Sequence, residues 1–376
     1  MHMVILAQKS PWLGKGLPHS DTLFGGLCWG IRALEGEQRL VALLEQFAAG
    51  SPPFVLSSVF PLLQGKGGET LPLLPQPRGA PKRGSEHDEP QGQRDRAGAI
   101  EDRAVGKKVR KAEWVTPRMF GDLARGTLNA SGIIEKAVFL KDWPEKPGSQ
   151  PKPEYACADR AILTADDVER LATKPKDGLV IWESVSNARN AIDRVSVETT
   201  AFFHEDGIVL GEGVRAYCLL DASEPDVARS VLAAFRWLGE RGIGGGASVG
   251  YGRFDAAAFE DVSWLPDDPA GNTRVTLSLY HPSVEERAAF AAHPEAVAYE
   301  PAIRKGRLES AFVPIPQVWK RSVLYLAEGA RFPAIPGRQH YGMNPVVTDE
   351  AEGLPDALRF EAQALGFAFT VGVKAA

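Results

Sequence analysis

The chain has 376 residues, of which 44% are hydrophobic and 24% charged, and its formal net charge is −5. This length accommodates two domains of ordinary size, and the composition is that of a soluble globular protein. No stretch reaches the roughly 20 consecutive apolar residues that span a bilayer, and three widely separated cysteines exclude a disulfide framework or a cysteine-based zinc site and suit a reducing compartment.

Charge is unevenly distributed, which matters because Lys and Arg bind the phosphates of nucleic acids. Residues 78–111 carry ten basic and six acidic residues, and residues 303–338 carry seven basic and two acidic ones. An acidic protein with two local basic tracts fits a subunit that meets RNA on one face and proteins on another. It also fits many enzymes.

The N-terminal region predicts one strand, two helices and an extended segment. Residues 3–8 are a short apolar run typical of a buried strand. Apolar residues then recur at helical spacing over 20–34 and again over 37–48. Residues 51–63 are β-like but framed by prolines, which predicts an edge strand or an extended segment.

Residues 64–111 differ in composition from the segments around them. Gly, Pro and charged residues dominate, and apolar residues nearly vanish between Pro75 and Ile100. Such a segment cannot bury enough apolar surface to offset the entropy lost on ordering. We therefore expect a flexible insertion over 64–111, part of which orders only on a partner.

A hairpin, a helix and a strand are predicted next. Residues 195–221 contain two strand patterns, and Glu-Asp-Gly at 205–207 is a turn signal between them. A capping box at Ser223 starts a helix that ends at Gly242. Residues 248–254 then read as a strand.

The resulting order is strand, helix, insertion, hairpin, helix, loop and strand, the βαββαβ pattern of ferredoxin-like or RRM-like domains. The remaining chain predicts a smaller second unit, with strands at 273–281, 321–327 and 366–373 and a helix at 284–292. Helices on one side of antiparallel sheets, twice over, indicate an α+β protein with tandem ferredoxin-like domains. We expect the domains to cover residues 1–260 and 261–376.

The glycine-rich loop GIGGGASVGYGR at 242–253 is the most informative motif. Its first six residues match G-x-G-x-x-A, but a dinucleotide-binding loop must leave a strand and open a helix. Here a helix is predicted to enter the loop and a strand to leave it. The Gly-Lys-Ser/Thr ending of a phosphate-binding P-loop is also absent from it. Both nucleotide interpretations therefore fail.

Glycines allow close backbone approach and positive φ, so consecutive N–H groups can converge on an anion. Ser248 adds a hydroxyl, Tyr251 a ring for stacking and Arg253 a fixed charge. This set suits a nucleic-acid backbone better than a small neutral ligand. A glycine-rich connection without a ligand remains an alternative.

A glycine-rich loop between the second helix and the last strand of a ferredoxin-like domain resembles the signature of the RAMP superfamily of CRISPR proteins. Three further segments, 19–31, 189–203 and 320–332, are similar to the family of the fourth subunit of the Csm complex. With the loop they form four matches in the order of the family, and together they cover both predicted domains.

The resemblance implies a non-catalytic RNA-binding subunit of a type III-A CRISPR effector complex. Members of that family bind the repeat-derived 5′ tag of the CRISPR RNA. They contact the large polymerase-like subunit on one side and the first backbone RAMP subunit on the other. The resemblance further implies a cytoplasmic protein that needs no cofactor or metal and meets no membrane.

We expect RNA to be bound by the loop and by polar residues of the segments around it. The expected residues are Lys9, His19, Ser20, Arg189, Asn190, Arg194, Gly244, Gly245, Gly246, Ser248, Tyr251, Arg253, Lys320 and Arg321. Arg and Asn suit phosphate and base-edge contacts. For Lys320 and Arg321, a solvated strand end is an equal alternative.

Asp21, Phe202 and Phe203 each have two interpretations. Asp21 either caps the first helix, which we favour, or faces the RNA. In RAMP proteins a thumb from the region of Phe202 and Phe203 can insert between RNA bases. We favour the other assignment, in which both rings belong to the core of the hairpin.

Two enzymatic alternatives depend on His19 and Asp21. RAMP endoribonucleases that process CRISPR RNA use general acid–base chemistry, often with a histidine near the position of His19. A metal-assisted ribonuclease would need a carboxylate such as Asp21 beside the phosphate. The other histidines are scattered without metal-ligand spacing, so we expect no enzymatic activity. A protein–protein scaffold is the third alternative.

Overall fold

The computed structural model describes residues 1–79, 96–144, 153–308 except 194 and 197, 319–348 and 362–375. Its largest sheet has the order β14-β1-β13-β4-β5, and β3 also pairs with β13. The strands are β1 (His2–Gln8), β3 (Phe54–Leu56), β4 (Phe60–Gln64), β5 (Thr70–Pro72), β13 (Val214–Ala222) and β14 (Phe254–Phe259). All these pairings are antiparallel.

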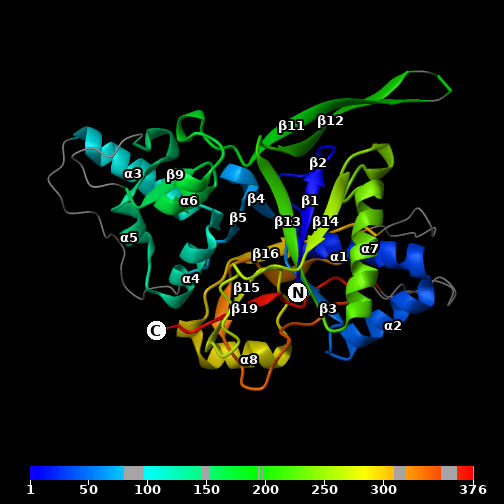
Figure 1. Cartoon of the computed structure of the whole chain (residues 1–376). Helices are drawn as coiled ribbons and strands as arrows, with labels where there is room; N and C mark the ends of the chain where they lie inside the picture. Colours follow the sequence, from blue (N-terminus) through cyan, green and yellow to red (C-terminus); the bar gives the residue numbers. More distant parts are fainter. Residues whose placement is uncertain are drawn as a thin grey trace.

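Three helices cover the main sheet (Figure 1). They are α1 (Ser20–Glu35), α2 (Glu37–Ala48) and α7 (Pro225–Arg241). Two glycines let them pack closely: a Cβ at Gly30 would lie 2.9 Å from the Cβ of Ala234, and one at Gly239 would lie 2.2 Å from the carbonyl oxygen of Phe254. The helix predicted to end at Gly242 does so, with that glycine at φ 98°.

The helix starts differ from the predictions. Glu224 precedes α7 without a side-chain cap, and the Ser223 hydroxyl instead donates to the carbonyl of Pro53. His19 occupies the N-cap position of α1, so Asp21 is not the cap. Both predictions were wrong because side chains that can cap a helix end can also bond to segments far away in the sequence.

A separate lobe carries the sheet β6-β7-β10-β9-β8 (Figure 1). Its strands are β6 (Leu74–Pro75), β7 (Trp114–Val115), β8 (Ala137–Phe139), β9 (Tyr155–Ala158) and β10 (Ala161–Thr164). Its helices are α3 (Arg96–Lys111), α4 (Pro117–Arg125), α5 (Ala130–Ile134) and α6 (Ala165–Arg170).

The described parts of 64–111 form regular structure instead of the flexible insertion expected. Leu71 of β5, Leu74 of β6 and Leu73 between them are buried, and so are Val105 and Val109 on the inner side of α3. Few apolar residues therefore suffice here, because each is placed on the inner face of its element. The middle of the insertion, 80–95, lies outside the described residues.

A long two-stranded ribbon projects from the body (Figure 1). It consists of β11 (Trp182–Ile192) and β12 (Thr199–Leu210), and β12 also pairs with β2 (Trp12–Leu13). The turn predicted at 205–207 is wrong, because these residues lie inside β12, where Gly207 pairs with Leu13. Glycine suits that position since a Cβ there would lie 2.9 Å from the carbonyl oxygen of Trp12.

The second half of the chain contains two smaller sheets, β18-β15-β19 and β16-β17. Its elements are β15 (Thr273–Thr276), α8 (Val284–Ala292), β16 (Pro301–Arg304), β17 (Val323–Leu326), β18 (Arg331–Pro333) and β19 (Thr370–Val373). A capping box formed by Ser283 and Glu286 starts α8. The protein is thus a mixed helix-and-sheet fold with several small sheets, as the α+β assignment predicts.

In the described ranges, every helix is too short or too polar to cross a bilayer.

Candidate nucleic-acid interface

The glycine-rich loop, residues 242–253, is closed by its own backbone. The amide of Ile243 donates to the carbonyl of Gly252 over 2.9 Å. A Cβ at Gly252 would lie 2.2 Å from the carbonyl oxygen of Ile243, and one at Gly242 would lie 2.2 Å from that of Tyr251. Both glycines also have positive φ. At these two positions glycine is therefore required by the closure of the loop itself.

The loop is anchored to the chain that follows β1. Lys9 and Ser10 donate backbone hydrogen bonds to the carbonyl of Arg253, and the Ser10 hydroxyl accepts one from the Arg253 amide. The amide of Gly252 donates to the carbonyl of Pro11. These bonds fix the position of the loop relative to β2 and to the connection that leads into α1.

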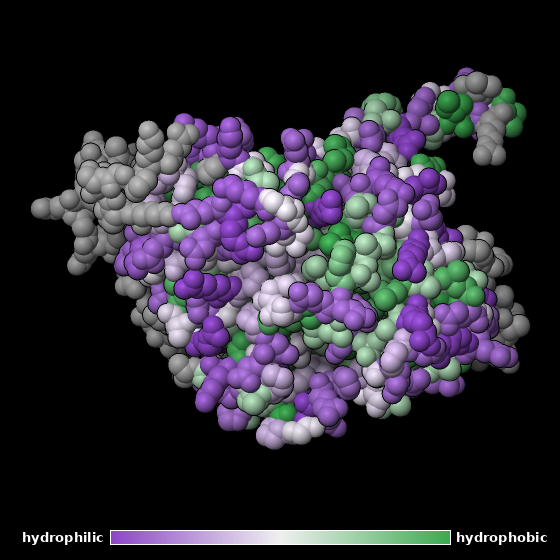
Figure 2. All heavy atoms as spheres, in the orientation of Figure 1, coloured by the Kyte–Doolittle hydropathy of each residue, from purple (hydrophilic) through white to green (hydrophobic). Residues whose placement is uncertain are grey.

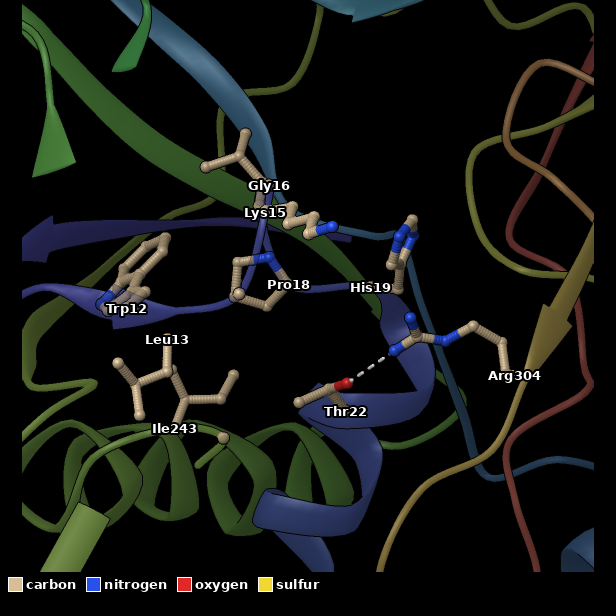
Figure 3. Close-up of a pocket in the computed structure, with 12 residues that line it drawn as sticks. Trp12, Leu13, Lys15, Gly16, Pro18, His19, Thr22, Ile243 and Arg304 are labelled. Atoms are coloured by element: carbon tan, nitrogen blue, oxygen red, sulfur yellow. Dashed lines mark hydrogen bonds between the residues drawn. The ribbon is translucent and has the colours of Figure 1, made fainter. Parts of the chain in front are cut away.

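A cavity of about 360 Å³ opens between the loop and this connection (Figure 3). Residues 12–19, Thr22, Ile243, Gly244 and Arg304 line it. Figure 3 shows the side chains of Lys15, His19 and Arg304 converging on the same space from the β2–α1 connection and from β16. Two permanent cations and a histidine thus face one cavity, an arrangement that attracts anions.

His19 is held by a carboxylate behind it. Its Nδ1 lies 2.7 Å from Oε1 of Glu328, whose side chain is 12% exposed and also accepts a hydrogen bond from the Ser58 hydroxyl. Burial acts to lower the pKa of His19, but the charge and hydrogen bond of Glu328 outweigh it, so the pKa is raised. Glu328 has a lowered pKa, since His19 and Ser58 overcome the effect of its burial.

Arg304 is fixed by the first turn of α1. It donates to both carboxylate oxygens of Asp21, over 3.1 and 3.2 Å, and to the hydroxyl of Thr22 over 3.3 Å. Lys320 lies near this pair, and its burial lowers its pKa although Asp21 and Cys28 oppose that effect. Asp21 is therefore committed to holding Arg304 at the cavity.

Four of the expected loop residues are accessible, and two are not. Gly244, Gly245, Ser248 and Arg253 are exposed. Gly246 is partly buried at φ 69°, and a Cβ there would lie 2.7 Å from the Tyr251 ring. Tyr251 is only 7% exposed, its hydroxyl accepts from Asn187, and Arg189 lies over its ring. The ring expected to stack on RNA instead joins the loop to the ribbon.

Ser20 and Lys9 are engaged within the protein. Ser20 is fully buried, and its hydroxyl accepts from the amide of Leu279, so its expected contact with RNA is contradicted. Lys9 forms an ion pair with Asp255 at 2.5 Å, which raises the pKa of Lys9. The sequence placed both near the loop but could not show which neighbours would satisfy them.

The remaining expected residues lie on the ribbon and near β17. Arg189 pairs with Glu205, and the Asn190 amide donates to Thr199 further along the ribbon. Arg194 lies outside the described residues. The amides of Lys320 and Arg321 donate to the carbonyls of Gly306 and Val347 at the start of the β17 segment.

Large apolar side chains are exposed on the ribbon. Phe202 is 66% exposed and Phe203 45%, so the favoured assignment to a hairpin core was wrong. Figure 2 shows hydrophobic residues gathered towards the far end of the ribbon. Both faces of a two-stranded ribbon that leaves the body meet solvent, which a strand pattern alone does not reveal.

Sequence reasoning missed Lys15 and Arg304, which supply the permanent charge of the cavity. Lys15 could have been found, since it follows β2 in the connection that faces the loop in the predicted fold. Arg304 carries no such signal, because it is 283 residues from its partner Asp21. In the described part of the chain, no group of three or more His, Cys, Asp or Glu residues could hold a metal ion.

Comparison with known proteins supplies the family context. The chain is 24% identical over 277 residues to a Csm4 protein of the CRISPR system of Thermococcus onnurineus, and the match covers 73% of each chain. No family model matches the chain.

Solved structures agree in fold. One is a crystal structure of a Csm3–Csm4 subcomplex of the type III-A CRISPR–Cas interference complex, with TM-score 0.60 and 15% identity, covering all of both chains. Another is a crystal structure of a Csm1–Csm4 cassette with cA4, with TM-score 0.52 and 18% identity, covering all of this chain and 98% of that one. The resemblance predicted from the sequence is thereby confirmed: the chain is similar in sequence to a Csm4 protein and similar in fold to structures that contain Csm4.

Proposed function

We propose that this chain is a non-catalytic RNA-binding subunit of a type III-A CRISPR effector complex and holds the 5′ tag of the CRISPR RNA. The observation that carries the proposal is the cationic cavity under the glycine-rich loop, where Lys15, His19 and Arg304 converge. Phosphates supply most of the affinity in such contacts, and fixed cations position them.

The surroundings of the cavity support an extended ligand over a small one. The cavity is open beside Gly244, and the exposed Gly245, Ser248 and Arg253 continue the surface. The ribbon adds the exposed rings of Phe202 and Phe203, on which unpaired bases can stack. A single-stranded RNA can therefore follow the loop and reach the ribbon.

The proposed partners are the large polymerase-like subunit and a backbone RAMP subunit, which this chain would bridge. Related Csm4 chains have been solved together with Csm3 and with Csm1. Those matches cover nearly the whole of both chains, which supports the proposal that this chain meets its partners through the equivalent surfaces.

We further propose tandem ferredoxin-like domains over residues 1–260 and 261–376. Support for the first comes from the order β14-β1-β13-β4, with α1 and α7 in the two crossovers, which is that of a βαββαβ domain. For the second, the support is the antiparallel sheet of β15, β18 and β19 together with helix α8, which follows β15 in the chain. A cytoplasmic location follows from the proposed complex.

A processing endoribonuclease is not favoured. That alternative depends on His19, which is paired with Glu328 behind the cavity. Among the described residues that line the cavity itself, none is a carboxylate that could act with His19. The curated relative is a Csm4 protein, and both solved structures named above contain Csm4.

The decisive experiment is purification of the full chain with its co-expressed complex, followed by sequencing of the bound RNA. We expect guides that share one uniform 5′ tag. Random cellular RNA would overturn the proposal, and absence of RNA would favour a protein scaffold. Cleavage of precursor RNA by the isolated wild-type chain, lost in His19→Ala, would favour the nuclease.

A matched pair of variants locates the site. Lys15→Gln removes a cation from the cavity, and we expect it to weaken binding of a tagged RNA about threefold to tenfold, as loss of one phosphate contact does. Lys174→Gln is the control, since Lys174 is exposed on a different part of the chain. Equal affinities of both variants would remove the cavity from the proposed interface.

A further inference from the structure

Helix α3 presents a row of cations that the proposed tag site does not use. Arg103, Lys107, Arg110 and Lys111 are all exposed, and their spacings of three and four residues place them on one side of the helix. None of the four forms an ion pair within the described part of the chain. We call these four residues the α3 row.

The opposite side of α3 is anchored in the lobe. Val105 and Val109 of the helix and Ala112 just after it are 0–7% exposed, and the helix packs against α5, β8 and β9. Gly106 sits close to Ile134, where a Cβ would lie 3.6 Å from the side chain. The α3 row is therefore held on a folded surface with a defined direction.

Other cations of the same lobe are neutralised locally. Arg118 pairs with Asp166, Arg125 with Asp122 and Lys136 with Glu154, at 2.8 to 3.5 Å. Lys108, beside the α3 row, donates to the carbonyl of Asp159. Among the side chains that the structure describes, the α3 row thus has no acidic partner, in a protein whose net charge is −5.

The chemistry of the surface favours a polyanion over a protein. Protein interfaces bury aromatic or aliphatic anchors at their centre. Among the described side chains, no large exposed hydrophobic residue lies on α3 or elsewhere in 103–144. Regularly spaced Lys and Arg without apolar anchors are suited to a nucleic-acid backbone, which is bound without regard to sequence.

The C-terminal end of α3 leads to the base of the ribbon. Trp114, three residues beyond the helix, packs edge-on against Trp182 at the start of β11, with ring centroids 5.0 Å apart. Further along β11, Arg189 lies over Tyr251 of the glycine-rich loop. One continuous set of elements thus joins the loop, the ribbon and α3 (Figure 1).

We propose that the α3 row is a second RNA contact, which binds the backbone of single-stranded RNA beyond the tag. The proposal rests on the proposed function, which supplies the RNA. It differs from that function in the residues used and in the part of the RNA that is held.

The test compares two triple variants of the full chain. Arg103→Gln, Lys107→Gln and Lys111→Gln together remove most of the α3 row and retain good helix formers. Arg118→Gln, Arg125→Gln and Lys136→Gln together remove the same charge from the same lobe, but from ion pairs. Thermal unfolding followed by circular dichroism confirms that each variant is folded.

Each protein is titrated with an RNA of the tag alone and with the tag extended by single-stranded RNA, at several salt concentrations. We expect the α3 variant to bind the extended RNA about tenfold more weakly, with a salt slope reduced by about two, because each phosphate contact contributes about 0.7. The tag alone and the control variant should show wild-type affinities.

Unchanged affinity of the α3 variant for the extended RNA overturns the proposal and leaves the tag site intact. If RNA binding is unchanged but a co-expressed subunit no longer co-purifies, the row binds an acidic protein instead. An equal loss in both triple variants would show a nonspecific effect of charge and would also overturn it. Failure of the wild-type chain to bind the tag alone is the separate result that removes the proposed function.

Discussion

The guanidinium of Arg304 binds both carboxylate oxygens of Asp21, a residue 283 positions earlier in the chain. Asp21 is 17% exposed and Arg304 35%, so the pair is partly shielded from water. The bond joins β16 of the C-terminal half to the first turn of α1. It also holds a positive charge at the cavity below the glycine-rich loop.

Arg304→Lys should destabilise the protein although the charge is kept. Lysine cannot reproduce the two-pronged geometry of the guanidinium, so we expect a loss of about 1–2 kcal/mol in the free energy of unfolding. Urea denaturation measures it. Combining this variant with Asp21→Asn should show a coupling energy between the two sites, whereas strictly additive losses would contradict the interaction.

Gly246→Ala should disrupt the loop, and Gly245→Ala should not. Gly246 has φ 69°, and a Cβ there would meet Tyr251 at 2.7 Å and Leu13 at 2.8 Å. A Cβ at Gly245 meets only Leu13, at an ordinary 3.7 Å. We expect Gly246→Ala to lower the free energy of unfolding by about 1–3 kcal/mol and to weaken RNA binding. Equal behaviour of the two variants would show that the loop is not closely packed.

The His19–Glu328 pair predicts a dependence of stability on pH. The pKa of His19 is raised in the folded protein, so protonated His19 stabilises the fold. This stabilisation is complete below the unfolded pKa of about 6.5 and is lost as the pH rises through the folded pKa. The lowered pKa of Glu328 means that its contribution is complete above about 4.5 and is lost as the pH falls through the folded value. The pair is therefore strongest between about pH 4.5 and 6.5.

The difference in free energy of unfolding between the wild type and His19→Gln checks this expectation. It should be largest in that pH window and should shrink above it as His19 loses its proton. Arg304 opposes protonation of His19 and Asp21 favours it, so Asp21→Asn should lower the folded pKa of His19 and with it the pH at which the difference is lost. A difference in free energy of unfolding that stays constant from pH 5 to 9 would contradict a role for the protonation of His19.

Ser20→Ala should affect stability and leave the RNA interface unchanged. The Ser20 hydroxyl accepts from the buried amide of Leu279, and its loss leaves that donor without a partner. We expect a cost of about 1–3 kcal/mol. Ser131→Ala is the control, because Ser131 is exposed in α5. A drop in RNA affinity measured on fully folded Ser20→Ala protein would restore Ser20 as an RNA-binding residue.

Replacing Phe202 and Phe203 by Ala should weaken RNA binding and leave stability almost unchanged. Both rings are exposed, so we expect a change in the free energy of unfolding within about 0.5 kcal/mol. Stacking of a base on an aromatic ring contributes about 1–3 kcal/mol, so affinity for single-stranded RNA should fall roughly tenfold or more. A clear loss of stability with unchanged affinity would return both rings to a structural role.

Local patterns were sufficient to predict β1 and the three helices that cover the main sheet, but not the elements of the separate lobe. Helical periodicity predicted α1, α2 and α7, and the glycine at 242 predicted where α7 ends, because these signals arise from neighbours within a few residues. The Glu-Asp-Gly signal at 205–207 failed for the converse reason. Gly207 serves the approach of Trp12 from β2, a contact between segments distant in the chain.

The sequence by itself determined the family resemblance, the glycine-rich loop and its position after a helix and before a strand. Only the tertiary structure decided which side chains face the cavity. Lys9, Ser20 and Tyr251 were expected to bind RNA, but Ser20 and Tyr251 are buried and bonded to Leu279 and Asn187, and the exposed Lys9 pairs with Asp255. The physical reason is that a polar side chain near a site bonds to the nearest suitable partner, and the fold alone determines that partner.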